Sequence, residues 1–553
     1  MTDEKTQLTN PAVPRIELWS FGGLMLAAAV VLPILSVLWI AATPSENIWP
    51  HLMATTLPRY LENTLVIMGC VAVFSACVGA ATAWLVVMYR FPGSRILEWL
   101  LLMPLAVPGY LGAYALVDFL EFAGPVQTML REIFGWQSAR DYWFPEFRSR
   151  GGAIFVLTAS LYPYVYLLAR AGFREQSGCA HEVARALGAG GVRLFTRIGL
   201  PLARPAIFAG SAIVMMETVN DFGTVDFFGV QTLTTGIFSV WLEAGNVGGA
   251  AQIATVILVL IFALVALEKI SRRKARFFRM TRQERHPAPT VLTGKRAWMA
   301  TLACTIPFLA GFVLPVGVLG RHALTRLDRW FAPGLAEALA NTLFVCGIAA
   351  VVTVGAATFM VYGVRLSGRA IPRLLLPLTT IGYAAPGAVL AVGLLIPLAA
   401  FDNALADAIS ALTKWDPGLL LTGGSTILIY AYAVRFFAIG QGAADAAMGR
   451  IAPNLPLAAR ILGQNASGTL WRVYLPLVRG SLAMALLLVF VDCVKELPAT
   501  LLLRPFNFNT LATRSFEQAS LEKVADAAPP ALLIIAVSLV AVALVAREMT
   551  RRI

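Results

Sequence analysis

Long uninterrupted stretches of hydrophobic residues dominate the pattern along this chain of 553 residues. Five stretches contain no Asp, Glu, Lys or Arg, namely residues 18–45, 63–89, 297–320, 338–364 and 374–401. Each stretch is longer than the roughly 20 residues that an α-helix needs to cross the hydrocarbon core of a bilayer. The pattern therefore predicts an all-α, polytopic membrane protein.

We expect twelve transmembrane helices. Their ranges are 18–42, 61–89, 96–118, 151–170, 204–228, 250–268, 297–320, 337–362, 372–400, 417–435, 479–502 and 529–546. Most of the 44 Lys and Arg residues fall in the segments on the same side as the N-terminus. Because cytoplasmic loops of membrane proteins are rich in Lys and Arg, we expect both termini in the cytoplasm. The N-terminal stretch has no basic segment followed by a cleavage site, so the first helix is expected to be retained.

Composition agrees with this class. Charged residues make up 14% of the chain, whereas soluble domains carry about a quarter. The formal net charge of +13 does not indicate nucleic-acid binding, because the basic residues lie between hydrophobic segments rather than in one patch. The six Cys and four His residues show no metal-ligand spacing, so we predict no metal site and no catalytic residue.

The two halves of the chain repeat the same short motifs. The pairs are Asn63-Thr64-Leu65 with Asn341-Thr342-Leu343, VGAAT at 78–82 with 354–358, Pro108-Gly109 with Pro386-Gly387, and Thr232-Leu233 with Thr510-Leu511. Six helices separate equivalent points, so the halves should be parallel and related by a pseudo-two-fold axis along the membrane normal. We therefore divide the chain into a first half at 1–270, a basic cytoplasmic linker at 271–296 and a second half at 297–553.

Each half also contains one polar, basic stretch, at residues 182–201 (EVARALGAGGVRLFTRIGLP) and 457–476 (LAARILGQNASGTLWRVYLP). A short helix in the first stretch should end at Gly188, because glycine readily adopts the left-handed conformation of a helix C-terminal cap. Pro201 suits the beginning of the next helix, where its missing N–H leaves no partner unpaired. The stretch predicts a helix–turn–helix elbow outside the membrane, joined rigidly to the next span.

These stretches resemble the EAA loop of ABC-importer permeases, which reads E-x-A-x-x-x-G, nine residues and I-x-L-P. The matching residues are Glu182, Ala184, Gly188, Ile198, Leu200 and Pro201 in the first stretch and Ala459, Gly463, Leu475 and Pro476 in the second. Leu457 and Val473 replace the glutamate and the isoleucine of the pattern. The resemblance implies that each elbow is a coupling helix seated on one of two copies of a cytoplasmic nucleotide-binding ATPase subunit.

Within that family, residues 217–241 and 495–517 resemble the fused twelve-helix permeases of bacterial ferric-iron importers. The resemblance implies an inner-membrane subunit that takes ferric iron from a periplasmic substrate-binding protein. The chain has no GxxxxGK[ST] phosphate loop. We therefore expect no enzymatic activity and no cofactor in this chain, with ATP bound by the partner subunit. Thiamine, polyamines and phosphonates are alternative substrates within the same class.

Five ionisable residues are expected inside membrane helices, namely Glu217, Asp221, Asp492, Lys495 and Glu496. A charge at the bilayer centre costs about 2.5–3.5 kcal/mol on insertion scales, so these side chains should face a cavity or one another. They could line a translocation pathway for a cation, since carboxylates suit hard cations. Alternatively, Asp492 and Lys495 could neutralise each other as neighbours on one helix.

Two further patterns concern individual helices. Tyrosines precede an arginine in residues 161–170 and 429–435, which indicates interfacial aromatics with a cytoplasmic arginine anchor; ligation of ferric ion by the phenol oxygens is the alternative. Kinked or broken third helices are predicted from four prolines, Pro104, Pro108, Pro377 and Pro386.

A proton- or sodium-coupled secondary transporter is the alternative from a different class, because such carriers also commonly have twelve helices in two parallel halves. The membrane acids could then relay protons. The loop after the second helix reads YRFPGSR, however, rather than the charged G-x-x-x-D-R motif of such carriers. They also have no use for a duplicated elbow, so the sequence favours the ATP-driven importer.

Overall fold

The computed structural model describes residues 18–176, 178–274, 289–367, 376, 379, 382 and 385–551. Within these residues the chain is helical except for loops and one pair of short parallel strands, β1 (Tyr89–Arg90) and β2 (Thr290–Val291). Pro377 and residues 275–288 of the predicted linker lie outside the described residues. The predicted all-α, polytopic fold is confirmed.

The described residues contain 11 helices that are long and apolar enough to cross a membrane, or up to 12 if one bent pair is counted. Eight are α1 (Leu18–Ala42), α3 (Leu57–Met88), α7 (Arg150–Arg174), α13 (Val247–Lys274), α16 (Leu335–Ser367), α19 (Gly387–Thr413), α20 (Thr426–Met448) and α26 (Val524–Arg551). Three contain a π-helical turn, namely α9–η2–α10 (Gly191–Asn220), α14–η4–α15 (Gly294–Thr325) and α22–η6–α23 (Ala466–Val494). The bent pair joins Ser94–Ala106 to Gly109–Phe134 at 96°.

Shorter helices connect these spans. In the first half they are α2 (Trp49–Ala54), α4 (Ser94–Leu100), η1 (Met103–Ala106), α5 (Gly109–Leu120), α6 (Pro125–Phe134), α8 (Gly178–Ala186), α11 (Gly223–Phe227), α12 (Leu233–Phe238) and η3 (Ser239–Glu243). In the second half they are η5 (Leu327–Phe331), α21 (Asn454–Ile461), α24 (Pro498–Leu503) and α25 (Leu511–Ser520). The components of the composite spans are α9 (Gly191–Leu194), η2 (Phe195–Gly199), α10 (Leu200–Asn220), α14 (Gly294–Phe308), η4 (Leu309–Val313), α15 (Leu314–Thr325), α22 (Ala466–Thr469), η6 (Leu470–Tyr474) and α23 (Leu475–Val494).

The π-helical turns of these three composite spans lie directly before Leu-Pro pairs. Proline lacks an N–H, and its ring collides with the carbonyl four residues earlier in an α-helix. In a π-helical turn each hydrogen bond joins residues five apart instead of four. The extra residue makes room for the proline ring. Pro201 is the second residue of α10, a position that suits proline. It does not begin a separate helix, however, because α9, η2 and α10 form one span. The fifth span begins before the predicted 204–228 for this reason, and it ends at Asn220 because the backbone of Asp221 is extended.

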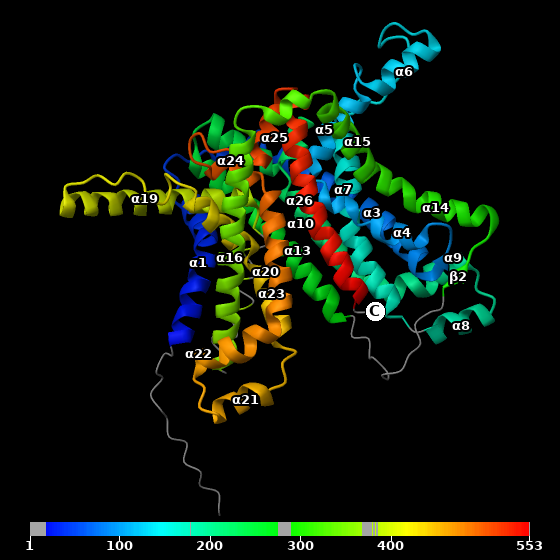
Figure 1. Ribbon diagram of the computed structural model, residues 1–553. Coiled ribbons are helices and arrows are strands. Elements are labelled where there is room, and N and C mark those ends of the chain that lie inside the picture. Colours follow the sequence, from blue (N-terminus) through cyan, green and yellow to red (C-terminus); the bar gives the residue numbers. More distant parts are fainter. Residues whose placement is uncertain are drawn as a thin grey trace, which may run out of the picture.

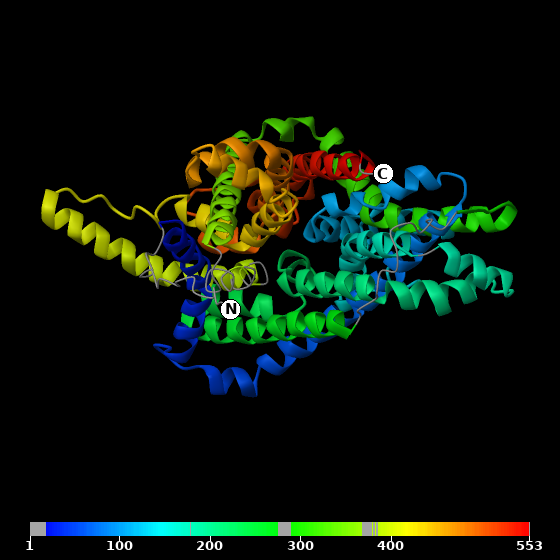
Figure 2. The same cartoon turned by 90° about the horizontal axis from the view of Figure 1, so that it is seen from below.

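The first span of each half packs against the opposite half (Figure 1). Helix α1 contacts α16 and α19, and the ring of Trp19 stacks on Phe359 with centroids 4.8 Å apart. Helix α15 contacts α5, where His322 Nε2 lies 2.9 Å from Asp118 Oδ2. Seen from below, the blue helix α1 lies on the side of the yellow and orange second half (Figure 2). The two halves of the sequence therefore exchange their first helices, while the domain boundaries stay a prediction.

Matching side-chain contacts recur in the two halves. The N–H of Leu233 donates to Thr64 Oγ1 at 3.0 Å, and the N–H of Leu511 donates to Thr342 Oγ1 at 2.8 Å. Thr232 and Thr510 begin α12 and α25 with the same reciprocal capping box. The sequence repeat thus extends to buried hydrogen bonds, whereas the direction of the axis that relates the halves stays a prediction.

These two threonines should stabilise the fold equally. Thr64→Val and Thr342→Val each leave a buried N–H unpaired, which costs about 1–3 kcal/mol. We expect both variants to lower the midpoint of thermal unfolding in detergent by similar amounts. Thr255→Val is the control, because that hydroxyl donates only within its own helix, to the carbonyl of Ala251. Unchanged midpoints for both variants would contradict the role of these bonds.

Candidate functional site

The first polar stretch forms the predicted elbow. Helix α8 is followed by Gly188, which has a φ of +79°. The N–H of Gly188 donates to the carbonyl of Arg185 and the N–H of Ala189 donates to that of Ala184, both at 2.9 Å. This pair of bonds is the Schellman motif, which satisfies the last carbonyls of a helix and favours glycine in the left-handed region. The predicted cap at Gly188 is confirmed.

The second elbow has the same geometry. Helix α21 is followed by Gly463 with a φ of +81°. The N–H of Gly463 donates to the carbonyl of Arg460, and the N–H of Gln464 donates to that of Ala459, both at 3.0 Å. The missing glutamate at Leu457 therefore leaves the backbone of the elbow unchanged.

Both elbows lie at one end of the bundle, together with the C-terminal end of α26 (Figure 1). Ala184 and Ala459 are each only 8% exposed, whereas Leu187 is 83% and Ile461 is 86% exposed. Each elbow thus presents apolar side chains to its surroundings, which is typical of a protein-binding surface. The other predicted coupling residues are Glu182, exposed on α8, Ile198, half-buried in η2, and Pro201 and Pro476, the second residues of α10 and α23.

A buried tryptophan attaches the first elbow to a membrane helix. Trp84 of α3 packs its ring against Phe173 and Phe195, each 5.3 Å away between centroids, and against His181 of α8 at 5.9 Å. A Cβ on Gly199 would lie 2.2 Å from this ring, so only glycine fits there. Trp84 therefore joins α8 and η2 to α3 through direct side-chain packing.

Tyr362 of α16 holds the second elbow in the same way. Its hydroxyl donates to the carbonyl of Ala466 at 2.6 Å, and its ring lies 5.3 Å from that of Tyr474. Trp84 follows the repeated Thr64 at the same spacing along the chain as Tyr362 follows Thr342. We did not predict that Trp84 and Tyr362 hold the elbows, because the two halves use different aromatic residues. Their equal spacing from the repeated threonines could have revealed them.

A cavity of about 160 Å³ lies between the halves. The five ionisable residues that we expected inside the membrane all line it, namely Glu217, Asp221, Asp492, Lys495 and Glu496. Within the described residues, no group of three or more His, Cys, Asp or Glu side chains is arranged to hold a metal ion. The structure thus gathers these charges at one place, while their part in translocation stays a prediction.

Two of the four acids also cap helices. Asp221 accepts hydrogen bonds from the N–H and the hydroxyl of Thr224, both at 2.9 Å, at the start of α11. Glu496 accepts one from the N–H of Ala499 at 3.1 Å, at the start of α24. Acidic side chains stabilise helix N-termini, where backbone N–H groups lack partners. Asp221 and Glu496 therefore position the short helices that border the cavity.

The glycines of the repeated Pro-Gly motif make room for these acids. A Cβ on Gly387 would lie 2.2 Å from Glu496 Oε1, and one on Gly109 would lie 3.3 Å from Asp221 Oδ2. The first residues of α5 and α19 can thus approach the carboxylates closely because they lack side chains.

A buried arginine that we placed elsewhere pairs with one of these acids. Arg435 Nε lies 3.1 Å from Glu496 Oε2, and Arg435 is only 8% exposed. The prediction of Arg435 as a cytoplasmic anchor at the end of helix 417–435 is wrong, because α20 runs from Thr426 to Met448. Arg170 is likewise internal to α7 and pairs with Glu98. Both helices continue past the arginine because an acid from a distant segment pairs with the charge.

Lys495 connects the two halves. Its Nζ donates to the carbonyl of Leu105 at 2.9 Å. This carbonyl is available because the third helix is broken between Ala106 and Gly109, as predicted from Pro104 and Pro108. No ion pair within 4 Å joins Lys495 to Asp492 among the described residues, but their opposite charges still attract each other, so mutual neutralisation stays an alternative.

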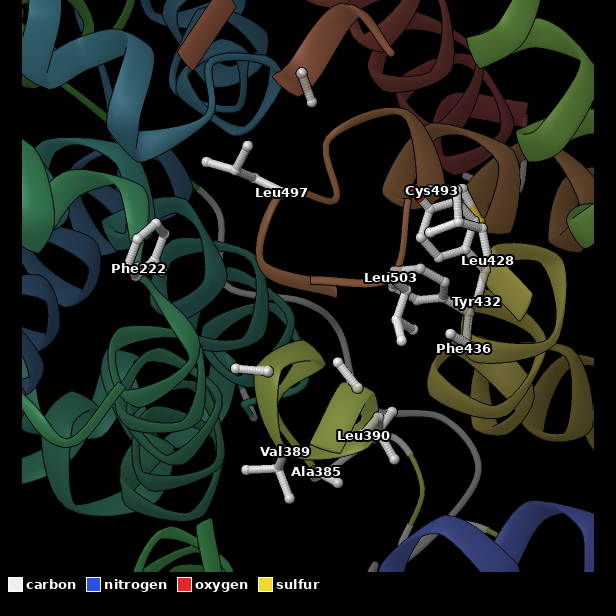
Figure 3. Close-up of a cluster of buried hydrophobic side chains, with 14 of the residues drawn as sticks. Phe222, Ala385, Val389, Leu390, Leu428, Tyr432, Phe436, Cys493, Leu497 and Leu503 are labelled. Atoms are coloured by element: carbon white, nitrogen blue, oxygen red, sulfur yellow. The ribbon is translucent and has the colours of Figure 1, made fainter. Parts of the chain in front are cut away.

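The residues that follow the capping acids also line the cavity, beyond the ends of α10 and α23. Phe222 lies 5.6 Å from Phe516 of the second half between ring centroids. Leu497 packs so closely on Gly223 that a Cβ there would lie 2.8 Å from its Cδ2. Figure 3 shows Phe222 and Leu497 apart from the group formed by Tyr432, Phe436 and Cys493. Phe222 and Leu497 follow the glycine of their own elbow at equal spacing, a signal that could have revealed this pair.

Residues 75–277 match the family model described as the binding-protein-dependent transport system inner membrane component. Residues 75–277 thus form a permease domain of this family. The chain is similar to the Fe(3+)-transport system permease protein FbpB 2 of Haemophilus influenzae, with 24% identity over 87% of this chain and 88% of the relative. The molybdenum permease ModB of Escherichia coli K12 is 27% identical, and the sulfate permease CysT of Salmonella typhimurium is 26% identical.

The last two relatives match only part of the permease. ModB aligns with 38% of this chain and 93% of its own length, and CysT aligns with 39% and 76%. Nearly the full length of ModB therefore aligns with less than half of this chain. This agrees with a chain built from two similar units.

Breaking the ion pair in the cavity should destabilise the permease. Glu496→Gln removes the ion-pair partner of the buried Arg435, and removing one partner of a buried pair costs about 3–5 kcal/mol. We expect a clear fall in the midpoint of thermal unfolding in detergent.

The matched control is Glu217→Gln in the same cavity. Within the described residues Glu217 forms no hydrogen bond or ion pair, so the amide should be tolerated with little change in the midpoint. Equal midpoints for the two variants would show that the pair with Arg435 does not stabilise the fold.

Proposed function

We propose that this permease is the membrane-spanning subunit of an ATP-driven importer that moves ferric iron from a periplasmic binding protein to the cytoplasm. The relative named for Fe(3+) transport supports this substrate, because it matches the permease over both halves. The partners would be a substrate-binding protein on the outside and two copies of a nucleotide-binding ATPase subunit in the cytoplasm.

The charge of the central cavity carries this proposal. Four carboxylates line the cavity, whereas only two cationic side chains do. Each of these two cations already has a partner. Arg435 pairs with Glu496, and Lys495 donates to a backbone carbonyl. Among the described residues Glu217 and Asp492 accept no hydrogen bond, and Arg435 and Lys495 act on them only as neighbouring charges. An excess of one charge in a cleft concentrates ions of the opposite charge, and carboxylate oxygens suit hard cations such as ferric iron.

Relatives named for molybdenum and sulfate transport support a different substrate within the same class. An oxyanion would enter a cavity lined by four carboxylates and two cationic groups, where the excess of like charge repels it. Thiamine, polyamines and phosphonates are further alternatives. The charge balance favours a cation over the anionic members of this set.

We infer that the elbows couple the ATPase to the cavity. Closure of the two ATPase subunits would move α8 and α21, and Trp84 and Tyr362 would pass the movement to α3 and α16. The halves would then rock so that the contacts of Phe222 and Leu497 separate and the cavity opens to the outside. This assignment places the elbows and both termini in the cytoplasm.

Uptake into vesicles that contain the permease, the ATPase subunit and the binding protein tests the substrate. We expect ATP-dependent uptake of radioactive ferric iron that excess sulfate, thiamine, polyamine or phosphonate does not reduce. The double variant Glu217→Gln with Asp492→Asn should lower iron uptake several-fold while the ATPase remains bound. Iron uptake that needs no ATP and stops with a protonophore would instead favour a proton-coupled secondary transporter.

Proline at the elbow glycines tests the coupling role. Because the proline ring restricts φ to negative values, Gly188→Pro and Gly463→Pro cannot form the left-handed cap. We expect both variants to insert into the membrane but to retain less ATPase subunit on purification.

Gly135→Pro is the matched control, because Gly135 also has a positive φ, of +70°, but follows α6 at the opposite end of the bundle (Figure 1). The control should retain the ATPase normally. Normal retention by both elbow variants would contradict the coupling role.

A further inference from the structure

A second cavity opens on the outer surface of the bundle, at the place where the halves exchange helices. Its volume is about 550 Å³, and most of its lining is apolar. Ile306, Leu309 and Val313 line one wall from the composite span α14–η4–α15, and Phe119 and Pro125 line the other from the first half. These three side chains of the span are 40–54% exposed. The groove therefore faces the surroundings of the bundle rather than the translocation cavity.

The groove is long enough for a lipid chain. Its lining along the span runs from Ile306 to Arg321, which is about 22 Å at 1.5 Å per residue. The hydrocarbon depth of one leaflet is about 15 Å, half of the core thickness. The span is among those that can cross a membrane, so its exposed apolar wall would lie against acyl chains.

One end of the groove carries a free cationic group. Arg321 is exposed and lines this end, and it forms no ion pair with an acid among the residues that the structure describes. Asp118 also lines this end, but its Oδ2 is engaged by His322 Nε2 at 2.9 Å. Helices α15 and α5 meet at the end of the bundle opposite α8 (Figure 1). If the elbows are cytoplasmic, Arg321 lies at the level of the outer-leaflet headgroups.

We propose that this groove binds one phospholipid of the outer leaflet, with an acyl chain against α14–η4–α15 and the phosphodiester at Arg321. A basic side chain at this depth attracts anionic headgroups, so the groove should prefer phosphatidylglycerol to a zwitterionic phospholipid. The bound lipid would contact α15 of one half and α5 of the other. It would thus stabilise the exchanged helix where the halves meet, independently of the transported substrate.

Two glycines of α15 provide a matched test of the groove. A Cβ on Gly317, which lines the groove, or on Gly320, which does not, would meet no atom within 4 Å. Gly317→Leu should therefore fill the groove without a clash, and Gly320→Leu should leave it open. Both variants and the wild type would be purified from vesicles of phosphatidylglycerol and phosphatidylethanolamine, and native mass spectrometry would count the retained phospholipids.

We expect the wild type and Gly320→Leu to retain one more phosphatidylglycerol molecule than Gly317→Leu. Equal numbers in all three proteins would overturn the proposal. Retention of detergent in place of phospholipid at this position would overturn it as well.

A second pair of variants tests the headgroup. Arg321→Gln should weaken phosphatidylglycerol retention about fivefold, because each basic residue near the surface contributes roughly 1 kcal/mol. Arg326→Gln is the control, since Arg326 ends the same helix but does not line the groove. The proposal fails if the wild type retains phosphatidylglycerol and phosphatidylethanolamine equally, or if both arginine variants lose lipid alike.

Discussion

The ion pair between Arg435 and Glu496 is the contact on which the candidate site depends. A charge inside the bilayer is tolerated only with a partner or in a wet cavity, and this pair joins α20 to the end of α23. Glu496 also caps α24, so one carboxylate fixes a helix, an arginine and the wall of the cavity. The neighbouring Lys495 extends this arrangement to the first half through the carbonyl of Leu105.

The same region shows where the repeat stops being symmetric. Asp221 caps α11 as Glu496 caps α24. Ser160 and Arg435 precede the glycine of their own elbow at equal spacing, and both line the cavity. The first half therefore has the capping acid without the arginine. Each half thus contributes two carboxylates to the cavity, whereas both cationic side chains come from the second half.

Much of this structure was predictable from the sequence because its causes are local. Hydrophobic runs mark the spans, Gly188 and Gly463 mark left-handed caps, and Pro104 with Pro108 marks the broken helix. Arg435 was misplaced because its partner lies on a distant part of the chain, and hydropathy alone ends a helix at the first charge. Contacts that depend on chain segments far apart, such as the exchange of first helices, have no signature in periodicity. The anchors of the elbows escaped notice because the halves fulfil one packing role with different side chains.

The exchange of first helices restricts how the two halves can move. Each half packs against a helix that belongs, by sequence, to the other half. Complete separation of the halves would therefore expose apolar surface on both. Small rotations about the crossing helices keep that surface covered. The crossed arrangement therefore favours limited rotation of the two halves over their complete separation.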